Sequence, residues 1–228
     1  MTIRSLMHRL AGDQRGLALL EFAFSLPIFL TMSLAGAELT NYIITRMRVS
    51  QIALQVADNA ARIGSGSQLE AKKISEADIN DLLIGSGMQA GELGLMTRGR
   101  VIISSLEPDP NNAGKYRIRW QRCGGAKTGH ASRYGAAGAD NLTGMGPAPQ
   151  ITAPADGVTM FVEVYYEYQP LVKTSLSPST EMDEIASMMV RDRRDTSDDS
   201  KLANGNNNPT PQHPNGVYKV AGVTASTC

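Results

Sequence analysis

Glu21 has the most unusual chemical setting in the chain, because it is the only ionisable residue between Leu17 and Ala37. An apolar segment of this kind has the length that a helix needs to cross a bilayer, about 20 residues. A carboxylate deep in such a segment costs on the order of 2.5–3.5 kcal/mol on insertion scales. Near the end of a span, where Glu21 lies, the carboxylate can reach the lipid headgroups at lower cost. Glu21 is therefore either a tolerated residue at the end of a span or a functional group.

The two cysteines, Cys123 and Cys228, offer a second kind of chemistry. Two cysteines in an exported chain favour one disulfide, because compartments outside the cytoplasm are oxidising. The alternative is a pair of free thiols. We expect the Cys123–Cys228 disulfide.

Other residues give little support for catalysis. The three histidines, His8, His130 and His213, have no spacing typical of a zinc site, and no serine or cysteine lies in a nucleophile motif. Asp109 begins an Asp-Pro-Asn-Asn stretch that favours a turn over a calcium loop, since the EF-hand spacing is absent. We expect no enzymatic activity, no cofactor and no metal site.

The charge pattern also argues against nucleic acid as a partner. The chain has 22 basic and 22 acidic residues, so its formal net charge is zero and it has no overall electrostatic attraction for a polyanion. A modest basic face is expected on one hairpin, without aromatic residues beside it, and we interpret it as surface charge. It comprises Arg117, Arg119, Arg122 and Lys127.

The residues that flank the apolar segment predict its orientation. Arg4, Arg9 and Arg15 precede it, and the next basic residues are Arg46 and Arg48. By the positive-inside rule, the N-terminus stays in the cytoplasm and the rest of the chain is exported.

Three interpretations of the segment remain open. A cleavable secretory signal is indicated by Ala35-Gly36-Ala37, which has the small-x-small form of a cleavage site, but the segment is longer than a signal core. A plain single-pass anchor explains the length and leaves Glu21 as a tolerated charge. In the third interpretation, Glu21 is functional.

The third interpretation rests on a resemblance. Gly16, four apolar residues, then Glu21 and Phe22 after a basic leader resemble a prepilin processing site. The segment from Leu19 to Ile43 is similar to TadE/TadG-like proteins of the Flp (tight adherence, type IVb) pilus system. Those proteins share a Glu-Phe-Ala core, a nearby proline and a distal acidic residue, here Glu21-Phe22-Ala23, Pro27 and Glu38. Flp-type prepilins usually have tyrosine in place of Phe22. The resemblance covers roughly the first third of the chain.

This resemblance implies cleavage by a membrane prepilin peptidase between Gly16 and Leu17. Leu17 would then carry a free amino group, and Glu21 lies one helical turn along the chain. Glu21 would pair with this amino group or with that of a neighbouring subunit. The implied partners are the peptidase, other pilin or pseudopilin subunits and the inner-membrane pilus assembly machinery.

The rest of the chain predicts an α+β fold with a small antiparallel sheet of about four strands and long loops. We expect a cytoplasmic leader at 1–16, the transmembrane half of a helix at 17–37, its amphipathic half at 38–64, and an exported domain at 65–228 that is loose at 203–216. Pro27 is expected to kink the helix.

Hydrophobic periodicity places the smaller elements. A capped helix is expected from Ser75 to Gly85, followed by a turn-rich passage. Strands are expected at 101–106, 116–121 and 158–168, with an ordered excursion around Tyr134 in the loop 124–157. Residues 184–191 suit a helix by pattern, but the family layout favours a fourth strand, and 217–223 could add an edge strand.

The amphipathic half of the long helix carries two apolar stripes, which we expect to pack on the chain's own domain rather than on another subunit. The first comprises Tyr42, Val49, Val56 and Ile63. The second comprises Ile43, Met47, Leu54, Ala57 and Ala61.

The sequence thus favours a minor pilin-like subunit of a Flp/Tad-type pilus. We expect it to be processed after Gly16, anchored or assembled at the bacterial inner membrane, and active in pilus biogenesis and adhesion. The alternative is a single-pass, membrane-anchored periplasmic binding module that enters no filament.

Overall fold

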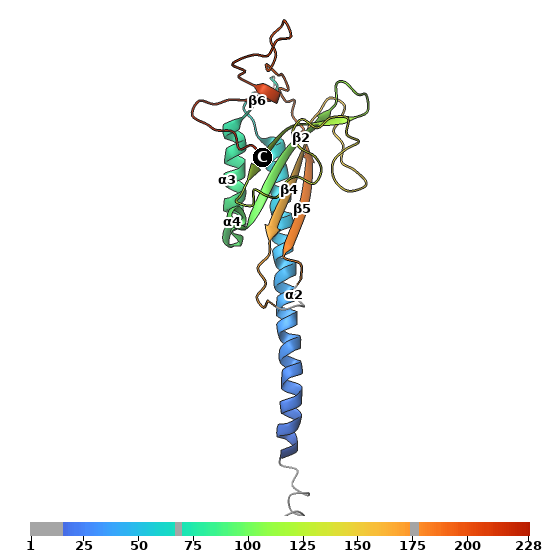
Figure 1. The fold of residues 1–228 in the computed structure, drawn as a ribbon, viewed down its shortest axis with the longest axis vertical. Coiled ribbons are helices and arrows are strands. Elements are labelled where there is room, and N and C mark those ends of the chain that lie inside the picture. The colour runs from blue at the N-terminus through green and yellow to red at the C-terminus, as the bar shows by residue number, and fades with distance from the viewer. Residues whose placement is uncertain (1–15, 67–69, 174–177) are drawn as a thin grey trace, which may run out of the picture. The chain divides into compact units, whose positions relative to one another are not determined.

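The computed structural model describes residues 16–66, 70–173 and 178–228. Its fold is α+β, as predicted (Figure 1). The helices are α2 (Leu17–Arg62), α3 (Glu76–Ala90), the short α4 (Leu95–Arg98) and two 3-10 turns, η2 (Gly91–Leu93) and η3 (Pro214–Gly216). The strands are β1 (Ile74–Ser75), β2 (Gly99–Pro108), β3 (Tyr116–Gly124), β4 (Thr159–Glu167), β5 (Glu181–Met189) and β6 (Val217–Tyr218).

The chain divides into two compact units. One comprises Met1–Ile44 and Pro170–Pro178, and the other comprises Thr45–Gln169 and Ser179–Cys228. Helix α2 therefore contributes its first part to one unit and its last part to the other. The predicted leader at 1–16, except for Gly16, lies outside the described residues.

The second unit is built around a four-stranded antiparallel sheet in the order β3-β2-β4-β5. The predicted hairpin and the strand at 158–168 are confirmed, and residues 181–189 form the fourth strand, β5, rather than a helix. The register between β2 and β3 shifts between Ser105 and Leu106 of β2, because β3 carries one extra residue there, as in a β-bulge.

The strand register shows what covers each face of the sheet. Arg122 of β3 pairs with Glu76 of α3, and Glu184 of β5 pairs with Arg46 of α2, so the helices lie on the face that carries these residues. The opposite face is covered by the long loop 124–157. Between the loop and this face of the sheet lies a hydrophobic cluster. Its buried residues are Leu106, Ile118 and Phe161 from the strands, and Met145 and Ala153 from the loop.

The loop excursion around Tyr134 is ordered, as predicted. Tyr134 contacts Phe161 edge to face, with ring centroids 5.4 Å apart. The carboxylate of Glu163 accepts hydrogen bonds from the Ser132 hydroxyl (2.5 Å) and the Arg133 amide (3.0 Å). Because the loop closes over this face, both faces of β2 and β4 are buried.

Helix α3 begins where the sequence predicts and ends later. Ser75 and Asp78 form a reciprocal capping box. The helix continues through Gly85 and Gly87 to Ala90, so the predicted end at Gly85 was wrong. An interior glycine costs only about 1 kcal/mol, and packing explains why Gly87 is present: a Cβ there would lie 2.7 Å from Cγ of Met96.

Only one side of the amphipathic half of α2 is buried. Val49, Ala53 and Val56 are fully buried in the second unit. Three side chains of the second predicted stripe, Ile43, Met47 and Leu54, are 48–57% exposed. The expectation that the domain covers these three side chains was therefore wrong. A domain packed on one side of a helix covers a single stripe of its surface.

The C-terminal segment is tied to β3 and to β1. The predicted edge strand at 217–223 is limited to β6, which pairs in parallel with β1 rather than with the main sheet. Residues 203–216 form turns and η3, and the Asp199 carboxylate accepts hydrogen bonds from the amides of Gln212 (2.6 Å) and His213 (2.9 Å). The expectation that this stretch is loose stays a prediction.

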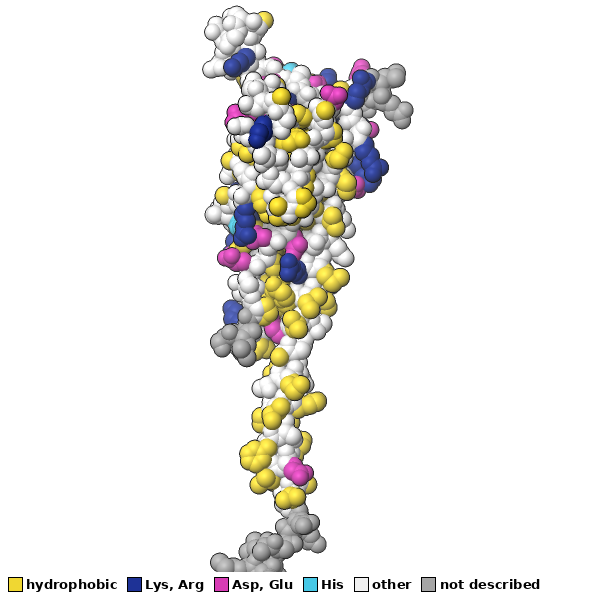
Figure 2. Space-filling view, turned by 90° about the vertical axis from the view of Figure 1, so that its right-hand side faces the viewer, with side chains coloured by type: hydrophobic (Ala, Val, Ile, Leu, Met, Phe, Trp, Pro, Cys, Tyr) yellow, Lys and Arg dark blue, Asp and Glu magenta, His cyan; other side chains and the backbone are white. Residues whose placement is uncertain are grey.

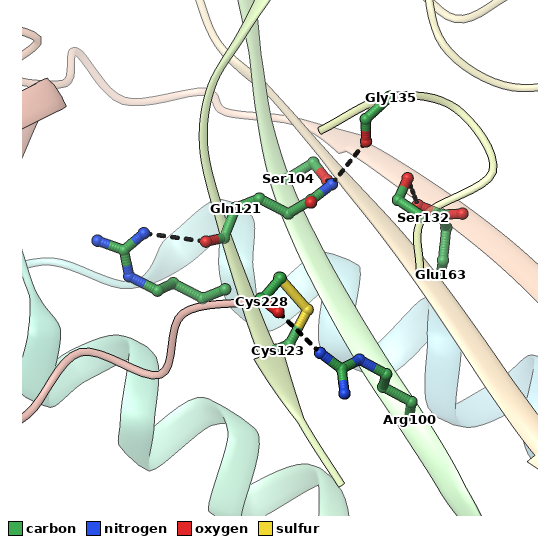
Figure 3. Close-up of a disulfide and its surroundings, with 9 residues drawn as sticks. Arg100, Ser104, Gln121, Cys123, Ser132, Gly135, Glu163 and Cys228 are labelled. Atoms are coloured by element: carbon green, nitrogen blue, oxygen red, sulfur yellow. Dashed lines mark hydrogen bonds between the residues drawn. A yellow bond between two sulfur atoms is a disulfide. The ribbon is translucent and has the colours of Figure 1, made fainter. Parts of the chain in front are cut away.

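The Cys123–Cys228 disulfide is present, as predicted (Figure 3). Beside it, the Cys123 amide donates a hydrogen bond to the Ser226 carbonyl (2.8 Å), so the last residues run along β3. The Arg100 guanidinium lies against the Cys228 carbonyl at 3.4 Å.

Replacing Cys228 with serine should release the C-terminal segment. The bridge closes a separation of 105 residues, and loss of such a disulfide costs about 2–5 kcal/mol of unfolding free energy. Limited proteolysis of the full chain should cut Cys228→Ser after residue 200 before it cuts elsewhere. Thr227→Ser, which keeps the bridge, should resist. Equal cleavage of both variants would show that the disulfide does not hold this segment.

Candidate functional site

The apolar part of α2 is exposed all round. Its large side chains reach exposures of 70% at Phe24 and 76% at Leu19, and the most apolar stretch of the helix has no buried residue within the structure. Figure 2 shows hydrophobic side chains (yellow) gathered along the apolar part of the helix. Among the residues that the structure describes, α2 is the one helix long and apolar enough to cross a membrane. Its length and composition are compatible with a single-pass anchor.

Gly16 and Leu17 lie where the helix begins. Gly16 is exposed, α2 starts at Leu17, and a Cβ added to Gly16 would meet no atom within 4 Å. The backbone of Gly16 is also not in the left-handed region that favours glycine. Nothing in the described residues therefore requires glycine at this position.

Glu21 has no partner within the described part of the chain. It is exposed on α2, and no hydrogen bond or ion pair joins its carboxylate to any residue that the structure describes. The adjacent Phe22 is also exposed, at 60%. The structure thus brings Gly16, Leu17, Glu21 and Phe22 together on the first turns of one helix, and leaves their surfaces free.

Helix α2 continues through Pro27. Proline removes the amide that would bond the Ala23 carbonyl. The Ser25 hydroxyl donates to the Phe22 carbonyl at 3.3 Å, so it does not replace that bond.

Glu38 is the polar residue whose importance the sequence did not reveal. It is buried, and one carboxylate oxygen, Oε2, accepts hydrogen bonds from the backbone amides of Leu171 (2.7 Å) and Val172 (3.2 Å). Both partners belong to the same unit as Glu38. The available signal was its position, since Glu38 is the first ionisable residue after the apolar segment.

The basic face predicted on the hairpin is not a surface feature. Arg119 is buried and pairs with the buried carboxylate of Glu107 at 3.0 Å, and Arg122 pairs with Glu76 of α3. Arg117 lies 3.5 Å from Glu107, and Lys127 pairs with Glu167. The prediction of a solvated charge pattern was wrong for Arg119 and Arg122, because β2 and α3 supply acidic partners for these two side chains.

Beside this hairpin is a cleft of about 1050 Å³. Five arginines line it: Arg117, Arg119, Arg191, Arg193 and Arg194. Burial lowers the pKa of Arg194 to about 10. Its Nη2 donates to the Ala60 carbonyl at 2.9 Å, and its Nε and Nη1 have no partner among the described residues. The acidic residues of the cleft are Glu107, Asp156, Asp192 and Asp198.

Asp109 forms a turn. Its carboxylate accepts hydrogen bonds from the Asn111 amide (2.9 Å), the Asn112 side chain (2.8 Å) and the Asn141 amide (3.0 Å). These bonds lower the pKa of Asp109, with the Asn112 bond contributing most. In the described part of the chain, no group of three or more His, Cys, Asp or Glu side chains is placed to hold a metal ion.

Comparisons with known proteins give no relative: no family model, curated protein or solved structure matches the chain.

Replacing Glu38 with alanine should expose two amides to exchange. Hydrogen bonds to charged groups such as a carboxylate contribute about 1.5–3 kcal/mol each. Hydrogen exchange at Leu171 and Val172 should therefore accelerate in Glu38→Ala, and should not change in the matched variant Glu21→Ala. Unchanged exchange in Glu38→Ala would show that the carboxylate does not hold this segment.

Proposed function

We propose that this protein is a minor pilin-like subunit of a Flp/Tad-type pilus. It is processed after Gly16 and anchored or assembled at the bacterial inner membrane, where it acts in pilus biogenesis and adhesion. The observation that carries the proposal is Glu21, an exposed carboxylate without a partner among the described residues, one turn from the first residue of an exposed apolar helix. The resemblance of residues 16–38 to TadE/TadG-like proteins supplies the class.

The proposed role of Glu21 is electrostatic. Cleavage between Gly16 and Leu17 places an ammonium group four residues before the carboxylate, and residues four apart lie on one face of a helix. Attraction between opposite charges is far stronger in a low-dielectric environment than in water. Pairing with the amino terminus of a neighbouring subunit would fix the register of packed helices and offset the cost of the buried charge.

The proposed topology has the N-terminus in the cytoplasm and the C-terminal domain exported. The arginines of the leader support this orientation through the positive-inside rule. The Cys123–Cys228 disulfide suits an oxidising compartment. In this proposal the protein recruits a prepilin peptidase and partner pilins, and performs no catalysis.

The arginine-lined cleft favours a second candidate function. A membrane-anchored periplasmic module could bind an anionic ligand there, since five arginines line the cleft and guanidinium groups bind carboxylates well. Binding of a polyuronate by the wild type, lost in Arg191→Gln and decreasing with salt, would support this function. An unprocessed chain that binds the polyuronate would favour it over the pilin role.

Gly16→Leu should block processing. The fold has space for a side chain at residue 16, so the variant should insert and fold normally, and its bulk should act only on the peptidase. Co-expression with a prepilin peptidase should shorten the wild type and the small-residue control Gly16→Ala, but not Gly16→Leu. Equal mobility of all three chains, each with Met1 intact, would contradict the proposal.

Glu21→Gln should insert into membranes and fail to assemble. Removal of the charge eases burial in lipid, but also removes the partner of the ammonium group. Crosslinking to partner pilins should be lost in Glu21→Gln, whereas Glu21→Asp, which keeps the charge, should retain part of it. If Glu21→Gln crosslinks as well as the wild type, the carboxylate merely reaches the headgroups.

A further inference from the structure

We propose that residues Leu171, Val172 and Lys173 form a membrane-surface loop, which lies in the lipid interface beside the end of the α2 span and is held there by Glu38. This inference rests on the proposed membrane anchoring of α2, and adds a second contact with the lipid from a segment far away in the sequence.

The first argument is the depth at which Glu38 lies. The apolar segment Leu17–Ala37 rises by 1.5 Å per residue, so it is about 30 Å long, and this length matches the hydrocarbon core of a bilayer. Glu38 follows the segment immediately. A span that fills the core with these residues places Glu38 at the boundary between the acyl chains and the headgroups.

The second argument is that Glu38 fixes the loop at the same depth. Its Oε2 accepts the amides of two consecutive residues, Leu171 and Val172, at 2.7 and 3.2 Å. The loop belongs to the same compact unit as the first part of α2 (Figure 1). Its backbone must therefore lie within hydrogen-bonding distance of the end of the span.

The third argument is the chemistry that the loop presents. Leu171 is 65% exposed and Val172 is 36% exposed, although both are apolar. Lys173 follows them and is exposed. Apolar side chains can enter the upper acyl region, while the ammonium group of a lysine extends to the anionic headgroups.

A lipid surface fits the loop better than a protein partner. The apolar surface of Leu171 and Val172 continues that of the α2 span, which has no cover within the described residues, and the loop's one charge has the sign that anionic lipids attract. The arrangement also explains why Glu38 is buried. A carboxylate at an apolar boundary requires donors, and the amides of Leu171 and Val172 supply two of them.

Depth-dependent fluorescence quenching tests the proposal. The full chain carrying Leu171→Trp is placed in phosphatidylcholine–phosphatidylglycerol vesicles whose acyl chains are brominated either near the headgroup or near the methyl end. The native Trp120 is buried, with 3% exposure, so the wild type gives the background. Phe29→Trp, in the middle of the span, is the positive control.

We expect the added signal of Leu171→Trp to be quenched more by bromine near the headgroup than by bromine near the methyl end, and Phe29→Trp to show the reverse order. Quenching of Phe29→Trp without quenching of Leu171→Trp would overturn the loop proposal and leave the anchor intact. Absence of quenching in both would overturn the anchor as well. Blue-shifted emission of Leu171→Trp without quenching would show that protein covers the loop, and would also overturn the proposal.

A second set of variants tests whether Glu38 holds the loop. In the Leu171→Trp background, Glu38→Ala should lower the quenching toward the wild-type background, because both amides lose their acceptor. Glu21→Ala removes a carboxylate from the same helix and should leave the quenching unchanged. Equal quenching in all three chains would show that the loop reaches the lipid without Glu38, and would overturn the anchoring role.

Discussion

The exposed apolar half of α2 is the constraint on which the account of this protein depends. Each Å² of apolar surface left in water costs roughly 25 cal/mol, and this half of the helix presents leucine, phenylalanine, isoleucine and methionine side chains on all sides. No described part of the chain covers them. The length and composition of this half are compatible with a membrane anchor, and in the proposed function the charged residues act at the two ends of that anchor.

The carboxylates at the two ends of this segment differ in their burial and hydrogen bonding. Glu38, at one end, is buried and bonded to two backbone amides of its own chain. Glu21, at the other end, is exposed and has no described partner. The described part of the fold therefore supplies donors to one carboxylate and none to the other. An amino terminus created at Leu17 would supply a partner of the correct sign at the correct distance.

The sequence predicted those elements whose signals are local. Alternation identified the strands around Trp120 and Val162, capping chemistry identified the start of α3, and the cysteine count identified the disulfide. The features that it missed depend on distant segments. Gly87 remains helical because Met96 packs against it, Arg119 is buried because Glu107 pairs with it, and Met47 is exposed because the domain packs on only one side of α2. The binding of Glu38 to the loop at Leu171 likewise joins residues that no local pattern connects.

The first residue of the mature chain is the most direct test of the central claim, that Gly16 and Glu21 prepare a charged terminus for assembly. The measurement is the mass of the N-terminal peptide of the protein, isolated from membranes of cells that express a prepilin peptidase. The account predicts a chain that begins at Leu17 and retains Cys228. A chain that begins at Met1 would contradict it, as would one cut after Ala37, because that cleavage would separate Glu21 from the exported domain.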